Sequence, residues 1–330
     1  MRKVVRSAVR TICVAGCLML FLSGSSFAEG ETAEALFMKA MQMETRDADY
    51  EGAIGVYEKI MRNCEDEETI SKTIKRMRDS YEKVGRKDEK ESGAVINKMF
   101  DVYRSLASYQ DTGEVETTML MGGAGTKQVM KSPFKMFFKR PNLLRFEWKS
   151  MMLFAQDNNI LWSNGEETYT YWPQFGQYKK DENLQMGMAA ATGVSGGSAH
   201  KIPSMLLSQN IFATLEPIFL CKGKFDGVEC HIIAGDYVMN SEIVLWIGTD
   251  DLLLRKVEAT MKSHKDILEK ARESLKESGS NVKIPDIKIP DFSSVIREVH
   301  REIKTNEDIP STVFSFIPPK GAKLVEKFKY

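Results

Sequence analysis

The sequence predicts a mainly β protein with α-helices: a strongly curved antiparallel sheet preceded by a small helical domain. From about residue 108 of the 330-residue chain, short runs rich in branched and aromatic residues alternate with turn signals, as is typical of antiparallel strands. Residues 29–91 are instead polar, with apolar residues at helical spacing. The length allows two domains and a substantial core.

The segment Phe134–Lys180 carries the aromatic residues around which the sheet is predicted to form. In Leu144–Lys149 large apolar residues alternate with charged ones, so the apolar side chains share one face of a strand. Asn164-Gly165 is a strong hairpin signal. This aromatic surface forms either an ordinary core covered by helices or the lining of an apolar cavity.

The amino-terminal residues 1–28 are predicted to be a secretory signal peptide. They contain four basic residues and no acidic one, an apolar stretch at 14–22, and a small-residue cleavage site ending at Ala28. The whole chain has 46 basic and 46 acidic residues. Removal of the signal leaves 42 basic and 46 acidic residues, a net charge of about −4. That balance gives no indication of nucleic-acid binding. Because a secretory signal peptide directs export across the inner membrane, the expected location is the periplasm.

Val14–Cys17 supports an alternative, because it resembles a bacterial lipobox in which Cys17 would be lipidated. Against it, the apolar stretch is short before Cys17 and continues beyond it. That stretch is also too short for a membrane-spanning helix. Cleavage after Ala28 is the main prediction, and a lipid anchor at Cys17 is the alternative.

Three cysteines follow the signal: Cys64, Cys221 and Cys230. Cys221 and Cys230 flank Asp226-Gly227, a hairpin signal, and the periplasm is oxidising. We therefore predict a cross-strand disulfide between them, with Cys64 free on a helix. The cysteines and the four histidines lack the spacing of a zinc site, so no metal or other cofactor is predicted.

Residues 29–92 are predicted to form a domain of helices near 35–43, 49–60 and 70–84. Small and aromatic residues recur at positions typical of a tetratricopeptide repeat: Ala40, Tyr50, Ala53, Ile54 and Tyr57. A simple helical hairpin is an equally supported interpretation. Because such repeats need neighbours to bury their faces, this domain should dock on the next domain or on a protein partner.

Residues 93–330 are predicted to form the sheet domain, beginning with an amphipathic helix at 94–106. Residues 181–201 read as a loose loop, 203–215 as a short apolar helix, and 263–295 as an insertion containing a charged helix at 264–277. The remaining strands are expected at 113–121, 127–139, 217–224, 228–235, 241–248, 253–262, 296–304 and 311–317.

Four motifs in this domain and a closing segment, in the same order, resemble the periplasmic lipoprotein carrier family LolA. They read FFKRPNLLRFEW from Phe137, SNGEETYTYWP from Ser163 with QFGQYKK after it, IPSMLLSQN from Ile202, and VFSFIPPKGAKLVE from Val313. The resemblance covers about residues 94–327, and LWIGTDDLLLRKVEAT, from Leu245, is similar to an uncharacterised branch of the superfamily. It implies a half-open antiparallel β-barrel with lid helices, and the insertion at 263–295 departs from the family pattern.

The resemblance also implies a function: binding acyl chains of lipoproteins or other lipids in a hydrophobic cavity, for outer-membrane sorting. It places Arg140 on the arginine of the carrier's Lys-Arg-Pro-Asn-Leu motif, which is tied to lid closure. Helices 94–106 and 203–215 are the lid candidates. The predicted lining residues are Phe146, Trp148, Trp162, Tyr171, Met205, Leu206 and Phe212.

Enzymatic activity is not predicted. Gly193–Gly197 matches the Gly-x-Ser-x-Gly pattern around Ser195, but no strand is predicted before it and the flanks are of low complexity. The alternative to a carrier is an envelope scaffold or sensor that uses the same fold and binds a protein partner through residues 29–92.

Overall fold

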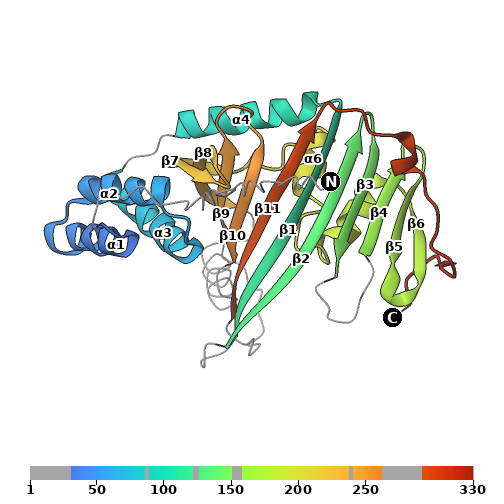
Figure 1. Ribbon diagram of the computed structural model, residues 1–330, viewed down its shortest axis with the longest axis horizontal. Helices are drawn as coiled ribbons and strands as arrows, with labels where there is room; N and C mark the ends of the chain where they lie inside the picture. Colours follow the sequence, from blue (N-terminus) through green and yellow to red (C-terminus); the bar gives the residue numbers. More distant parts are fainter. Residues whose placement is uncertain are drawn as a thin grey trace, which may run out of the picture.

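The computed structural model describes residues 31–85, 89–121, 126–150, 158–237, 241–261 and 292–329. They form an open twelve-stranded sheet with helices on both faces (Figure 1). The strand order is β12-β6-β5-β4-β3-β2-β1-β11-β10-β9-β8-β7. Neighbours are antiparallel apart from β12, which runs parallel to β6. The predicted antiparallel sheet is thus confirmed, as a large open sheet.

The strands follow the predicted order along the chain. Their bounds are β1 Ser108–Met121, β2 Thr126–Lys139, β3 Leu143–Lys149, β4 Asn158–Asn164, β5 Thr168–Trp172, β6 Gln177–Asp181, β7 Glu216–Phe225, β8 Val228–Tyr237, β9 Ser241–Gly248, β10 Leu254–Met261, β11 Phe292–Thr305 and β12 Lys323–Leu324. The helices are α1 Ala33–Gln42, η1 Met43–Asp47 (a π-helix), α2 Tyr50–Asn63, α3 Glu67–Val84, α4 Glu89–Ser105, α5 Leu184–Thr192 and α6 Lys201–Leu206, with short 3₁₀ turns η2 Pro173–Phe175 and η4 Ser311–Phe314.

One face of the sheet, here called the inner face, is covered by α4, α5 and α6. Helix α4 lies along the upper ends of the strands in Figure 1, and α6 lies behind the sheet. Helix α4 is amphipathic, with Ile96, Met99 and Tyr103 buried on the side that meets the sheet. A single apolar cluster joins these helices to the inner-facing side chains of the strands.

The opposite, outer face of β7, β8 and β9 is covered by α1, α2 and α3. Side chains of the three helices share an apolar cluster with Ile232, Val244 and Trp246 of the strands. Asp49 and Asp66 cap the starts of α2 and α3, and Gly85 ends α3 in the left-handed conformation (φ 66°). The apolar side of this helical segment therefore packs on the sheet.

Strand β7 is one edge of the sheet, and helices protect it. Tyr81 of α3 donates a hydrogen bond to the carbonyl of Leu220 (2.7 Å), and Ser92 of α4 donates one to that of Pro217 (2.9 Å). Both acceptors are on β7. Helices from the two sides of the sheet thus meet at this edge and bind backbone groups that another strand could otherwise use.

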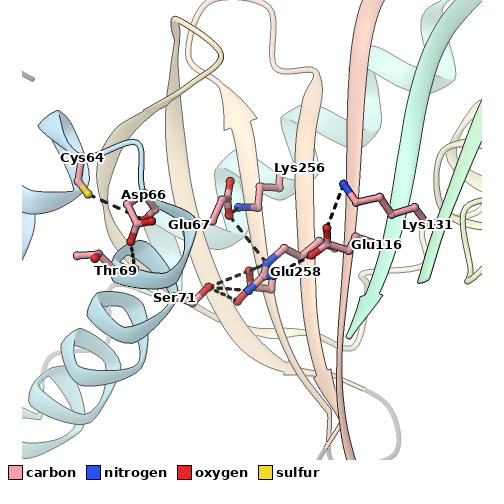
Figure 2. Close-up of polar contacts among 10 residues, drawn as sticks. Cys64, Asp66, Glu67, Thr69, Ser71, Glu116, Lys131, Lys256 and Glu258 are labelled. Carbon is pink, nitrogen blue, oxygen red and sulfur yellow. Dashed lines mark hydrogen bonds and ion pairs between the residues drawn. The ribbon is translucent and has the colours of Figure 1, made fainter. Parts of the chain in front are cut away.

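A row of charged side chains crosses the outer face from α3 to β2 (Figure 2). Ser71 of α3 donates a hydrogen bond to Glu258 (3.0 Å), which accepts another from Arg297 Nε (2.7 Å). Glu116 continues the row between Arg297 (3.3 Å) and Lys131 (3.3 Å). These alternating charges fix α3 on the sheet.

Three sequence-based predictions of secondary structure differ from the structure. The segment predicted as a loose loop at 181–201 contains α5, whose buried Leu184 and Met188 pack on the inner face. The strand predicted at 311–317 is instead the turn η4 followed by extended chain. Pro310 precedes that turn and Pro318-Pro319 follows it, and proline cannot donate to a sheet ladder. The predicted helix at 203–215 is the shorter α6, because Ser208 is left-handed (φ 64°).

The predicted disulfide between Cys221 and Cys230 is also wrong, since the structure holds both as free, buried thiols, together with Cys64. A register shift between Phe219 and Cys221 places Cys221 opposite Ile232 and Cys230 opposite Gly223. The two sulfur-bearing residues therefore do not face each other across the hairpin.

Several predictions fall outside the described residues. They are the signal peptide at 1–28, the lipobox cysteine Cys17, the helix at 264–277 and most of the insertion at 263–295. Residues 29–92 as a separate domain, and their tetratricopeptide character, stay predictions. Among the helices that the structure describes, none is both long and apolar enough to cross a membrane.

Candidate functional site

The inner face carries a row of aromatic side chains on neighbouring strands. The rings of Phe134 and Phe146 are stacked with centroids 5.6 Å apart, and the rings of Phe146 and Trp148 are 5.5 Å apart. All three side chains are buried. Since residues two apart on a strand share a face, the alternation in β3 places Phe146 and Trp148 together, as predicted from sequence.

Residues from α6 and the turn after it complete this apolar site. Met205, Leu206 and Phe212 are buried in the same cluster as Phe146 and Trp148. Five of the seven predicted lining residues are therefore brought together between the sheet and its covering helices. Their role in binding a ligand stays a prediction.

Trp162 and Tyr171 do not belong to this site, so their prediction as lining residues is corrected. In the register of β3 and β4, Phe146 faces Leu161, which turns Trp162 to the outer face. Tyr171 pairs with Ile160 on that same outer face. The C-terminal segment Asp308–Lys329 covers Trp162 through Phe316, whose ring centroid lies 3.7 Å away.

Arg140 binds the end of helix α4. Its Nε donates to the carbonyl of Leu106 (2.7 Å), and its Nη2 donates to the carbonyls of Tyr103 (3.3 Å) and Arg104. The last carbonyls of a helix have no partner within the helix and carry partial negative charge, so a guanidinium there is favourable. Arg140, in the turn between β2 and β3, thus ties α4 to the sheet.

A cleft of about 500 Å³ opens between α4 and the segment that leads into β7. Ile96 of α4 lines one side, and Phe212 and Leu215 line the other. These three side chains also belong to the inner apolar cluster. The cleft is therefore a point at which solvent reaches the margin of the covered inner face.

Four charged side chains form a buried cluster at one end of the aromatic row. His300 of β11 lies 2.7 Å from Asp111 of β1 through Nδ1, and 3.2 Å from Glu298 through Nε2. Glu298 also accepts a hydrogen bond from Lys201 Nζ of α6 (2.6 Å). The ring of Phe134 meets that of His300 edge-on, with centroids 5.4 Å apart.

The protonation states in this cluster are set by its own charges. Burial opposes a charged imidazole, but Asp111 and Glu298 outweigh it and raise the pKa of His300 to about 9. Burial also opposes a charged carboxylate and would raise the pKa of Glu298. The positive charges of Lys201 and His300 outweigh burial and lower the pKa of Glu298 to about 2. Near neutral pH both residues are therefore charged.

Sequence reasoning missed this cluster, because no spacing along the chain brings His300 together with particular carboxylates. A signal was present: Asp111 alternates with Tyr109, Gly113 and Val115 along β1, so a charge occupies an otherwise small or apolar face. The pairing of Gly113 with His300 and Val115 with Glu298 depends on strand register, which the sequence does not specify.

Two other kinds of site, a serine nucleophile and a metal centre, are not formed in the described parts of the chain. Ser195 is fully buried, and its hydroxyl donates to the carbonyl of Thr192 (3.3 Å) and accepts from the backbone N–H of Ala199 (3.1 Å). It therefore lacks the exposed position of a nucleophile in a hydrolase elbow. No group of three or more metal-binding side chains in the described parts of the chain is arranged to hold an ion.

No protein-family model matches this chain, and no curated protein matches it significantly. Solved structures similar to it include a LolA superfamily protein from Nitrosomonas europaea (9% identity, 68% of this chain and 97% of that one, TM-score 0.28). A second is a putative outer membrane lipoprotein-sorting protein domain from Vibrio parahaemolyticus (10% identity, 69% of this chain and 97% of that one, TM-score 0.31). A third is LprF from Mycobacterium bovis (9% identity, 72% of this chain and 100% of that one, TM-score 0.33).

Proposed function

We propose that this protein is a non-enzymatic carrier that binds acyl chains between the inner face of its sheet and the helices α4 and α6. The observation that carries the proposal is the bond of Arg140 to the end of α4, directly beside a continuous apolar layer. Helix α4 covers apolar surface and is held by a few directional bonds, those of Arg140 at its carboxyl end and that of Ser92 near its amino end, so it is suited to opening and closing.

The apolar layer has the chemistry that an acyl chain requires. Burial of each methylene group contributes about 0.8 kcal/mol, and the aromatic row supplies flat area along which a chain can lie. Met99 of α4 and Met205 of α6 add flexible side chains that adapt to cargo of different shapes. In the absence of cargo, the helices themselves fill this space.

Loading then requires α4 and α6 to move away from the sheet. Arg140 favours the closed state, because its bonds to the α4 carbonyls exist only when the helix is in place. The cleft between α4 and the segment before β7 is the proposed entrance. The carrier would act in the periplasm after removal of residues 1–28, with sorting of lipids or lipoproteins to the outer membrane as its proposed role.

Binding of a protein partner through residues 29–92 is the second candidate. The apolar side of α1–α3 is occupied by the sheet, so a partner would use the polar surface of these helices. A cleft of about 550 Å³ lies there, lined by charged and polar residues that include Glu44, Arg76 and Asp79.

Native mass spectrometry of detergent-free protein from the periplasm, followed by lipid extraction, tests the proposal directly. Adducts that resolve into acyl lipids or lipopeptides are expected. A stoichiometric protein partner with no lipid bound would instead support the second candidate.

The Arg140→Leu variant tests the closing bond. Removal of bonds that exist only in the closed state should raise the open fraction and tighten the binding of a fluorescent acyl probe by about tenfold. Arg145→Leu is the matched control, since Arg145 lies nearby but on the outer face, bound to Glu147. Equal probe affinity and transfer in wild type, R140L and R145L would exclude a role of Arg140 in closure.

A further inference from the structure

The buried charge cluster joins a covering helix to the fixed sheet. Lys201 belongs to α6, whereas Asp111, Glu298 and His300 belong to the paired strands β1 and β11. If α6 moves away from the sheet, as the proposed function requires, Lys201 leaves and the other three stay. The charges that remain are two negative and one positive, a net −1 in an apolar layer.

Glu298 is the residue most affected by that departure. It is fully buried in the middle of β11, and Lys201 Nζ is its hydrogen-bond donor. Its second oxygen, Oε1, lies 3.2 Å from His300 Nε2 but forms no hydrogen bond with any residue in the described ranges. His300 stays beside Glu298, but the three remaining charges still sum to −1, and an uncompensated buried charge is strongly unfavourable, so opening of α6 creates a site that requires positive charge.

The charge of the ligand that this site requires depends on which of Lys201 and Glu298 can move into solvent. The Lys201 side chain is 14% exposed and sits on a flexible stem at the start of α6, so it can carry its charge into solvent. The Glu298 side chain is 1% exposed and is fixed in the sheet. An anionic ligand would add to the charge left behind, whereas a cationic ligand would neutralise it.

The position of the cluster also fits the end of an amphiphile. Phe134 contacts His300 and is followed by Phe146 and Trp148 along the inner face. A cation held at Glu298 would therefore lie at the beginning of an apolar track. Such a ligand carries an ammonium group at one end and a hydrocarbon chain behind it.

We propose that Glu298 is a headgroup site that binds the ammonium group of an amphiphilic cargo in place of Lys201 Nζ. This inference rests on the proposed function, since it assigns a cargo class to the same inner face. Asp111 and His300 hold Glu298 in position, and the chain of the cargo lies along Phe134, Phe146 and Trp148. Cargo thus replaces the internal ammonium group as α6 opens.

The test compares three probes with the same chain, dodecylamine, dodecanol and dodecanoic acid, by calorimetric titration at neutral pH and below their micelle concentrations. The wild-type protein is expected to bind the amine at least about tenfold more tightly than the other two. Glu298→Gln should lose this preference and still bind dodecanol.

A second variant keeps the test decisive if E298Q folds poorly. Lys201→Met removes the internal ammonium group, so dodecylamine should raise the melting temperature of K201M more than that of wild type. Lys180→Met is the matched control, because Lys180 forms a comparable pair with Glu167 (2.7 Å) on the exposed surface. Its response to the amine should equal that of wild type.

Two outcomes overturn the inference, and they are distinguishable. If wild type binds all three probes equally, carriage of acyl chains stands and the headgroup site is wrong. If wild type binds none of them, and extracted protein holds no lipid, the proposed function itself fails together with the headgroup site.

Discussion

At the scale of single residues, the charge of His300 is the feature with the clearest measurable effect. Asp111 and Tyr109 of β1, Glu298 of β11 and Lys201 of α6 are the titratable groups of this cluster. The two carboxylates outweigh burial and favour the charged imidazole. The raised pKa of His300 therefore links folding stability to pH.

The sign of this dependence is fixed by the pKa values. His300 titrates near 6.5 when unfolded and near 9 when folded, so its contribution is complete below pH 6.5 and is lost as pH rises through 9. We expect wild type to lose up to about 3 kcal/mol of unfolding free energy over this range, beyond the loss seen in His300→Gln. Urea unfolding at a series of pH values measures the difference.

His231→Gln is a useful control for that experiment. Burial is the main cause that lowers the pKa of His231, so its contribution is lost as pH falls below 6.5 rather than as pH rises. H231Q should therefore alter the acid side of the stability profile. Identical alkaline profiles for wild type and H300Q would show that His300 carries no charge in the folded protein.

The sequence correctly predicted the face of a side chain where the alternation within one strand decides it. It failed where the face depends on the register between two strands. The alternation within β3 correctly placed Phe146 and Trp148 on one face. The faces of Trp162 and Tyr171 depend on how β4 pairs with β3 and β5, and a shift of one residue reverses the face. The contact between Arg140 and α4 came from family resemblance, since no local pattern predicts it.

At the scale of elements, the C-terminal segment Asp308–Lys329 acts as a cover for the outer face near β4–β6. Figure 1 shows it (red) passing from the end of β11 toward this end of the sheet. Phe316 packs on Trp162 and on Tyr169, whose centroid is 4.7 Å away, and β12 then pairs with β6. The segment is held by aromatic contacts and by a two-residue strand.

We expect Phe316→Ala to destabilise the fold by about 1–2 kcal/mol, because it removes this half-buried ring from three aromatic neighbours, Trp162, Tyr169 and Tyr178. Unfolding in urea followed by circular dichroism measures the change. Ile317→Ala is the control, since Ile317 is 82% exposed and its loss should cost less than about 0.5 kcal/mol. Equal stability of F316A and I317A would mean that the segment does not hold the sheet.

The sequence predicted elements well when a single strong periodicity ran through them. Helices α2 and α3 have apolar residues at helical spacing and clear caps, and both were placed within a few residues. Helix α5 was missed because its glycine and alanine content resembles a loop, whereas packing on the sheet supplies its stability. The strand expected at 311–317 had the right composition, but the segment lies over β3 and β4 and pairs with no strand in the described part of the chain.

At the scale of the whole molecule, the sheet separates two helical layers that should respond independently. Arg140, in the turn between β2 and β3, fixes α4 on the inner side, and Tyr81 fixes α3 to the edge strand β7 on the outer side. Each variant that removes one of these bonds should loosen its own layer and leave the other unchanged.

Hydrogen exchange of backbone amides tests this independence. R140L should accelerate exchange in the last turn of α4 by about five- to tenfold, corresponding to about 1 kcal/mol or slightly more, with no change in α3. Tyr81→Phe should show the opposite distribution, with faster exchange in α3 and β7. Acceleration of both layers by either variant would mean that they open as one cooperative unit.

The whole-molecule architecture was predicted only in part. A mainly antiparallel sheet preceded by helices followed from turn signals and periodicity, and the structure confirms an open sheet of this kind. Family resemblance implied that α4 covers the inner face, but the face that α3 covers was not predictable, because both helices are amphipathic and adjacent in sequence. Their separation onto opposite faces depends on contacts with β7, far along the chain.

The distribution of the four tryptophans gives each layer its own natural fluorophore. Trp148 lies in the inner apolar cluster, and Trp246 lies under α1–α3 with the ammonium group of Lys256 4.5 Å from its ring. Trp162 and Trp172 pack against Phe316 and Phe328 of the C-terminal segment. Single-tryptophan variants with phenylalanine at the other three positions would therefore report cargo entry, movement of the amino-terminal helices and release of the C-terminal segment as three separate optical signals.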